Sequence, residues 1–454
     1  MPESAHSYPN STTRQMPDHP DTGAAHADPL RIGRLPVAFF VVSVIFFAIG
    51  VCAIPFAVPY ASGFFYQAIV IAVVHTFTLG WITAAIMGVM YRYVPALTHV
   101  PIRSPRLAYA QLVIFTIGVS GMVVHFALGA WIGLWLAAIA VVVSIVMFAA
   151  NIVPSLWRQF GRGVAETGIL LAIGFLLIAA ALGAILGIDK TYDFLGGNVL
   201  TNLSAHVHLA AVGWVTMAIC AVSYRMLPAF LLPKVTLPRH AIWQLYALAA
   251  AVSALAVSLF FALGGETIFA IAIAAAMGWY IAIIARIVAT RRMPMDWTPR
   301  HALTGAASLA IALALGIMLT IVGGDSVWGA RIAPAYGVAG LLGFFSNFII
   351  GMSYKLFPAF VTRARQGCGW TAVTIDELSI VRTRWFVFGA FNGGVALMIA
   401  GFLVGAIEIV RAGAILTAAG GVVYSATTLW TLSFAFRAAA PTAAAQTSLR
   451  ILPE

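Results

Sequence analysis

Long apolar runs follow one another along almost the whole chain, separated by short stretches that are charged or rich in proline and glycine. About 20 apolar residues in a helix cross the hydrocarbon core of a bilayer, because each helical residue adds ~1.5 Å. The pattern therefore predicts an all-α membrane protein with twelve transmembrane helices, near residues 35–60, 66–94, 107–128, 130–153, 166–188, 203–228, 241–264, 266–290, 301–323, 332–358, 384–405 and 410–436. Residues 1–34 are polar, and we expect them to form a disordered tail, with a second tail at 437–454.

The basic residues fall almost entirely on one side of these spans. Of the 25 Lys and Arg residues, 22 lie on one side, and the other side has only Lys190, Arg331 and Arg411. Lys and Arg accumulate in cytoplasmic loops, so we expect both termini in the cytoplasm. This arrangement is expected of a multi-pass protein in a bacterial-type inner (plasma) membrane.

The composition excludes several classes of protein. The chain is 62% hydrophobic and only 9% charged, which leaves too few charged side chains to cover the surface of a soluble enzyme of this length. The net charge of +11 follows from the cytoplasmic loops, so nucleic acid is not an expected partner and the lipid bilayer is. The three cysteines lie in or beside apolar stretches and do not form a disulfide framework.

The sequence contains a threefold internal repeat. Residues 73–97, 206–230 and 336–360 align without gaps at offsets of 133 and 130, which is four spans each time. The shared positions include Gly80, Gly213 and Gly343; Trp81, Trp214 and Phe344; Tyr91, Tyr224 and Tyr354; and Pro95, Pro228 and Pro358. We therefore predict three parallel four-helix repeats, at about residues 35–160, 161–295 and 296–436.

The end of the shared segment reads Tyr-Arg-x-x-Pro or Tyr-Lys-x-x-Pro in all three repeats. We interpret it as a membrane stop signal, with a tyrosine at the lipid interface, a cation near the headgroups and a proline that ends the helix.

Four of the ten histidines lie well inside the predicted spans: His75, His125, His206 and His208. The rise of the helix places all four about 25–28 Å from the cytoplasmic ends of their spans, at one depth in the outer half of the membrane. Ionisable groups inside a membrane usually mark function, and neutral imidazole is a good ligand for haem iron, copper or zinc. The alternative is that each histidine only forms hydrogen bonds across helices. His206 and His208 are ~200° apart around a helix, so they cannot bind one ion from the same face but can serve two sites on opposite faces.

These features carry a resemblance to a known family. Twelve spans in three parallel units, with His-x-His on an inner helix, resemble the catalytic subunit (subunit I) of the haem–copper oxidase superfamily. Residues 205–230 are similar to the His-x-His helix of C-type oxidases and their nitric oxide reductase relatives. The resemblance implies haem, expected to be b-type, and copper as a second cofactor. It implies that His206 binds a high-spin haem and that His208 and His75 share a low-spin haem. A cytochrome or quinol electron donor and other oxidase-type subunits are the implied partners.

The sequence also departs from the family's pattern. His-x-His lies in the second repeat instead of the third, where Tyr336 and Val338 take the matching positions, and the seventh span has only His240, at its cytoplasmic edge. The family's three-histidine copper site therefore cannot be assembled, although a shifted site is conceivable, with haem on His206 and copper on His75 and His125.

Two functions stay open at this point. The first is a haem-binding redox protein for electron transfer or for handling a diatomic gas or copper. Such a protein would be an oxidoreductase for which the sequence argues against oxygen or nitric oxide reduction. The second is a transporter for a metal ion or small solute.

Overall fold

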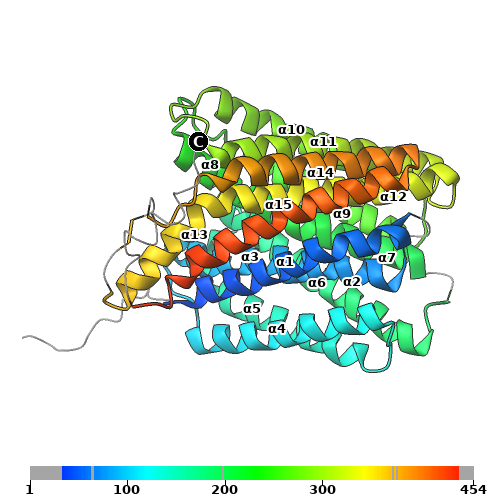
Figure 1. Cartoon of the computed structure of the whole chain (residues 1–454), viewed down its shortest axis with the longest axis horizontal. Coiled ribbons are helices and arrows are strands. Elements are labelled where there is room, and N and C mark those ends of the chain that lie inside the picture. The colour runs from blue at the N-terminus through cyan, green and yellow to red at the C-terminus, as the bar shows by residue number, and fades with distance from the viewer. Residues whose placement is uncertain (1–32, 63–65, 197–198, 371–372, 375–376, 439–454) are drawn as a thin grey trace, which may run out of the picture.

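The computed structural model describes residues 33–62, 66–196, 199–370, 373–374 and 377–438, so most of both predicted tails lies outside the described residues. Within this part of the chain every regular element is a helix, and twelve helices are long and apolar enough to cross a membrane. Figure 1 shows them running roughly parallel in a single bundle. The predicted fold class, an all-α protein of twelve transmembrane helices, is confirmed.

The helices follow the predicted spans closely. The first four spans are α1 (Leu35–Ala61), α2 (Ala68–His75) with η1 (Thr76–Thr83) and α3 (Ala84–Thr98), α4 (Pro105–Leu128), and α5 (Leu134–Leu156) with η2 (Trp157–Gln159). The next four are α6 (Val164–Tyr192), α7 (Val199–His208) with η4 (Leu209–Thr216) and α8 (Met217–Leu231), α9 (Ala241–Phe260), and α10 (Glu266–Ala289). The last four are α11 (Trp297–Val322), α12 (Val327–Val338) with η5 (Ala339–Ser346) and α13 (Asn347–Gly367), α14 (Thr383–Val404), and α15 (Ile407–Ser433).

The bundle closes on itself. The last helix, α15, packs along the first, α1, with the rings of Phe47 and Tyr424 5.4 Å apart and Gly421 directly against Val51. The first repeat therefore packs against the third through α1 and α15, as expected when three units surround one axis.

The second span of each repeat, here called the inner helix, contains an eight-residue π-helical segment. These segments are η1, η4 and η5, and their starting residues are separated by 133 and 130, the same offsets as the sequence repeat. π-Helical turns are rare and often lie at functional sites. The sequence analysis predicted the helices but not this change of winding, because a π turn inserted into a largely apolar run leaves the hydrophobic pattern unchanged.

Matching side chains join the inner helices at the centre of the bundle. The indole Nε1 of Trp214 donates a hydrogen bond to Thr83 Oγ1 of the first repeat, at 3.0 Å. The indole Nε1 of Trp81 donates to Ser346 Oγ of the third repeat, at 3.3 Å. Thr83 and Ser346 occupy the same repeat position, so one contact is used twice around the pseudo-threefold axis.

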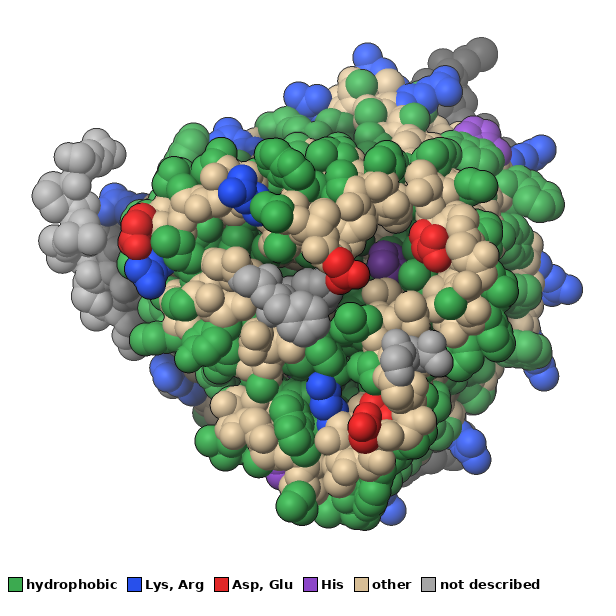
Figure 2. Space-filling model, turned by 90° about the vertical axis from the view of Figure 1, so that its right-hand side faces the viewer, with side chains coloured by type: hydrophobic (Ala, Val, Ile, Leu, Met, Phe, Trp, Pro, Cys, Tyr) green, Lys and Arg blue, Asp and Glu red, His purple; other side chains and the backbone are tan. Residues whose placement is uncertain are grey.

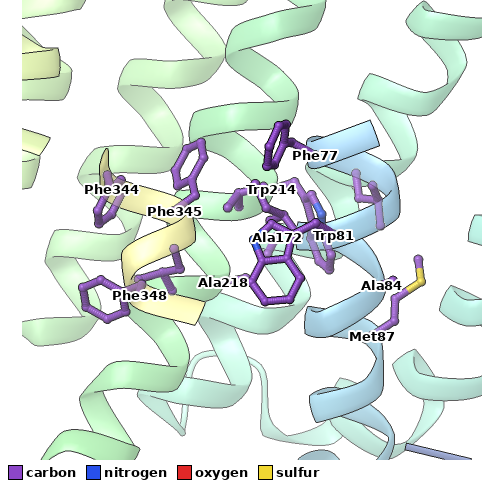
Figure 3. Close-up of a cluster of buried hydrophobic side chains, with 14 of the residues drawn as sticks. Phe77, Trp81, Ala84, Met87, Ala172, Trp214, Ala218, Phe344, Phe345 and Phe348 are labelled. Carbon is purple, nitrogen blue, oxygen red and sulfur yellow. The ribbon is translucent and has the colours of Figure 1, made fainter. Parts of the chain in front are cut away.

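The third contact of this kind is missing. Phe344 takes the tryptophan position and has no N–H group to donate to Thr216. Thr216 keeps the bond that its hydroxyl donates to the carbonyl oxygen of Ala211, as Ser346 does to that of Leu341. Figure 3 shows Phe344 with Trp81 and Trp214 in one cluster of buried side chains. Phe344 also borders an apolar cavity of about 60 Å³ between the second and third repeats, lined there by Leu227 and Tyr280 among others.

The shared Tyr-x-x-x-Pro segment is not the interface stop predicted from the sequence. Tyr91 and Tyr224 are buried, and their hydroxyl groups donate to the side-chain oxygens of Gln111 and Gln244, at 3.2 and 2.8 Å. The prolines also lie inside the helices, since α3 continues three residues beyond Pro95. The pairing of a buried phenol with a buried amide satisfies both groups inside the bundle, which explains why the tyrosines face inward.

Candidate functional site

Two of the predicted site residues stand directly before π segments. His75 is the last residue of α2 and His208 is the last residue of α7, and the same position of the third repeat holds Val338. The turn that follows is wider than an α-helical turn, so the side chains of the two histidines are set at a break in the helical packing.

A backbone carbonyl orients each of the three central imidazoles. The Nδ1 atoms of His75 and His208 lie 2.9 and 2.7 Å from the carbonyl oxygens of Ile71 and Ser204, one turn back on the same helices. His206 Nδ1 lies 2.9 Å from the carbonyl oxygen of Ala179 on α6. A carbonyl oxygen can only accept, so each Nδ1 carries the proton and each Nε2 presents a lone pair. This is the tautomer in which histidine binds a metal through Nε2, with the carbonyl as its supporting partner.

The Nε2 atoms of these three histidines make no hydrogen bond within the part of the chain that the structure describes. All three side chains are half-buried although they lie on the inner helices. Each ring is therefore partly accessible, and its Nε2 is free to accept a ligand bond.

His206 and His208 face different neighbours, as their two-residue spacing predicts. His206 lies against α6, where the hydrogen of Gly183 leaves room for the ring, since a Cβ there would be 2.7 Å from Cε1. His208 instead stacks on Tyr336 of the third repeat, with ring centroids 6.5 Å apart.

These outer contacts obey the repeat symmetry. His208 and Tyr336 occupy the repeat positions of His75 and His206, so the repeat places His75 and His206 in the same relation at the boundary between the first and second repeats. The repeat thus defines two sites around the axis, one with two imidazoles and one with an imidazole and a phenol.

The fourth predicted residue, His125, lies on α4 and has its own carbonyl partner. It is near the end of α4, is half-buried, and its Nδ1 bonds to the carbonyl oxygen of Ala130 at 2.8 Å. Among the residues that the structure describes, no group of three or more His, Cys, Asp or Glu side chains is placed to hold one metal ion. A copper site with three or more of these ligands is therefore not formed by the described side chains.

The sequence analysis missed a fifth histidine inside a span. His301 is fully buried in α11, its Nδ1 lies 2.8 Å from Asn347 Oδ1, and its Nε2 has no hydrogen-bond partner. The helix begins at Trp297, four residues before the predicted start, because the Asp296 carboxylate caps it by accepting from Thr298 N at 3.1 Å. An aspartate just before an apolar run is a helix-start signal, so the sequence contained the information.

The outer end of the bundle is hollowed above the histidines. Figure 2 views the end from which the inner helices begin, and it shows one histidine side chain deep in a hollow between acidic side chains. At this end the Lys190 ammonium lies 3.8 Å from the ring centroid of Tyr66 and 5.3 Å from that of Trp131. Burial, and then the nearby carboxylate of Asp189, raise the pKa of the Tyr66 phenol to about 12. The phenol therefore stays neutral, and the Lys190 ammonium lies against the face of its ring.

Comparison with known proteins gives a likeness in structure only. No protein-family model matches the chain, and no curated protein matches its sequence. The structure is similar to a heme-copper terminal oxidase dimer solved by cryo-electron microscopy, with a TM-score of 0.58 and 14% sequence identity over 93% of this chain and 85% of that chain. At this identity the likeness concerns the fold: the chain is a membrane protein with the haem–copper oxidase fold.

Proposed function

We propose that this protein binds haem in the membrane and takes part in electron transfer or in handling a diatomic gas or copper. The observation that carries the proposal is the hydrogen bonding of the ring nitrogens of His75, His206 and His208. Each has its Nδ1 anchored to a carbonyl oxygen and its Nε2 without a hydrogen-bond partner in the described part of the chain. Three such imidazoles on the inner helices of a haem–copper oxidase fold suit haem iron as a ligand set.

These residues have defined tasks in the proposal. The three histidines would hold the prosthetic group, and their carbonyl partners would keep the rings in the ligating tautomer. The bound haem would supply one-electron chemistry and the capacity to bind a diatomic gas. A cytochrome or quinol donor and other oxidase-type subunits are the proposed partners, and an inner membrane with both termini in the cytoplasm is the proposed location.

Copper is a second candidate cofactor. His75 and His125 offer two imidazoles at most, so we propose copper handling only as a weaker binding function and do not extend the proposal to oxygen or nitric oxide reduction.

A reduced-minus-oxidised absorption spectrum of the purified protein in detergent tests the proposal. We expect a haem spectrum that changes in the His75→Ala, His206→Ala and His208→Ala variants. The control is His240→Ala, because His240 Nδ1 already accepts from Trp279 Nε1 at 3.0 Å. A protein without haem that takes up a metal ion in vesicles would instead support the transporter hypothesis.

A further inference from the structure

We propose that Lys190 binds the carboxylate groups of the haem, at a site between the first and second repeats to which His75 and His206 both contribute. This inference deepens the proposed function and rests on it. It pairs His75 with His206, whereas the family resemblance pairs His75 with His208.

The pairing follows from the sequence repeat and one observed contact. His208 stacks on Tyr336 across the boundary between the second and third repeats, and His75 and His206 occupy the same two positions at the boundary between the first and second repeats. One cofactor therefore reaches His75 and His206 without crossing an inner helix.

A continuous series of aromatic contacts leads from His75 to the outer end. The ring of His75 lies 5.0 Å from that of Phe126, and Phe126 lies 6.2 Å from Trp131. Trp131 in turn lies 5.3 Å from the Lys190 ammonium, which sits 3.8 Å from the ring centroid of Tyr66. Aromatic walls suit the flat apolar face of a porphyrin, and the series ends in a cation.

The opposite wall is α6, and it reaches the same cation. Ala179 and Gly183 contact the His206 ring, and Lys190 lies seven residues beyond Gly183, two helical turns along the same face. At ~1.5 Å per residue, this places Lys190 about 10 Å farther out than the imidazole contact. The glycine and the lysine thus mark the inner and outer ends of one wall.

The electrostatics favour Lys190 over the other outer cations. Arg411 forms an ion pair with Glu408 at 2.7 Å, and Arg331 lies against Trp328 and Gly405. Within the described part of the chain Lys190 has aromatic neighbours and no ion pair, and the adjacent Asp189 carboxylate accepts from Leu195 N at 2.7 Å. An ammonium at the mouth of a pocket is a suitable partner for an anion, and haem carries two carboxylates at one edge.

The test is the rate at which purified protein loses haem to an excess of an apo-globin acceptor. Lys190→Met should release haem roughly tenfold faster or more, the effect of losing one charge-assisted hydrogen bond. Lys190→Arg should retain near wild-type release, and Arg331→Met should behave as wild type. His75→Ala and His206→Ala should alter the same absorption band, which His208→Ala should leave in place.

The outcomes separate the two proposals. Wild-type release from Lys190→Met, or a band shared by His75 and His208 instead, would overturn this inference while leaving haem binding intact. Wild-type protein that contains no haem would overturn the proposed function and this inference with it. Elution volume and helical circular dichroism of each variant show whether it is folded, and a misfolded Lys190→Met is replaced by Lys190→Gln.

Discussion

The hydrogen bond between Trp214 and Thr83 offers a quantitative test of the pseudo-threefold packing. Both side chains are nearly inaccessible, with Trp214 1% and Thr83 2% exposed, and the Nε1–Oγ1 distance is 3.0 Å. Trp214→Phe removes the donor and also some packed volume, so the single variant mixes two effects. A double-mutant cycle with Thr83→Val isolates the hydrogen bond.

Interhelical hydrogen bonds in membranes average about 0.6 kcal/mol in such cycles and reach about 1.7 kcal/mol. The short, well-buried Trp214–Thr83 contact should lie in the upper half of that range. The Trp81–Ser346 contact, at 3.3 Å, should give a smaller coupling. The assay is the free energy of unfolding when SDS is titrated into the protein in mild detergent.

The third repeat supplies the control, since Phe344 has no N–H to donate. A cycle of Phe344→Leu with Thr216→Val should give a coupling close to zero. Equal couplings at all three positions, or none at Trp214–Thr83, would show that the inner helices do not use these contacts.

Three further outcomes follow from the same packing and from the outer end. Gly213→Ala should destabilise the protein by about 1–3 kcal/mol, because the added Cβ would lie 2.6 Å from Phe175 Cγ. Gly174→Ala is the control: this glycine has open space around it, so the substitution should have little effect in the same SDS assay. Phe344→Trp should raise stability by partly filling the neighbouring apolar cavity, and a loss of stability would mean that the cavity cannot accept the larger ring. The pKa of Tyr66 is about 12 in the folded protein and about 10 in the unfolded chain, so the free energy of unfolding should fall as the pH rises between these values. The Tyr66→Phe variant should lose less stability than the wild type over the same pH range.

The sequence predicts the fold well because the bilayer imposes a simple rule. Apolar runs of sufficient length must be helices, and the twelve predicted spans differ from the observed helices mainly at their ends. The gapless repeat also predicts the equivalence of positions such as Gly80 and Gly213, which both pack against a phenylalanine of the first helix of their repeat.

The features of the structure that could not be predicted from the sequence depend on how each helix is rotated and locally wound. The π segments after His75 and His208 leave no mark on a uniformly apolar sequence. Which histidine faces which repeat is set by side-chain packing, so the contact between His208 and Tyr336 could not be deduced from depth alone. The roles of the histidines as cofactor ligands stay a prediction.

The central claim is tested most directly by measuring haem content. The purified wild-type protein is compared with a double variant that carries His75→Ala and His206→Ala. Pyridine haemochrome analysis, scaled to protein concentration, measures it. The account predicts stoichiometric haem in the wild type and a marked loss in a double variant that still elutes as a folded protein. Undetectable haem in the folded wild type, after expression with an adequate haem supply, would contradict it.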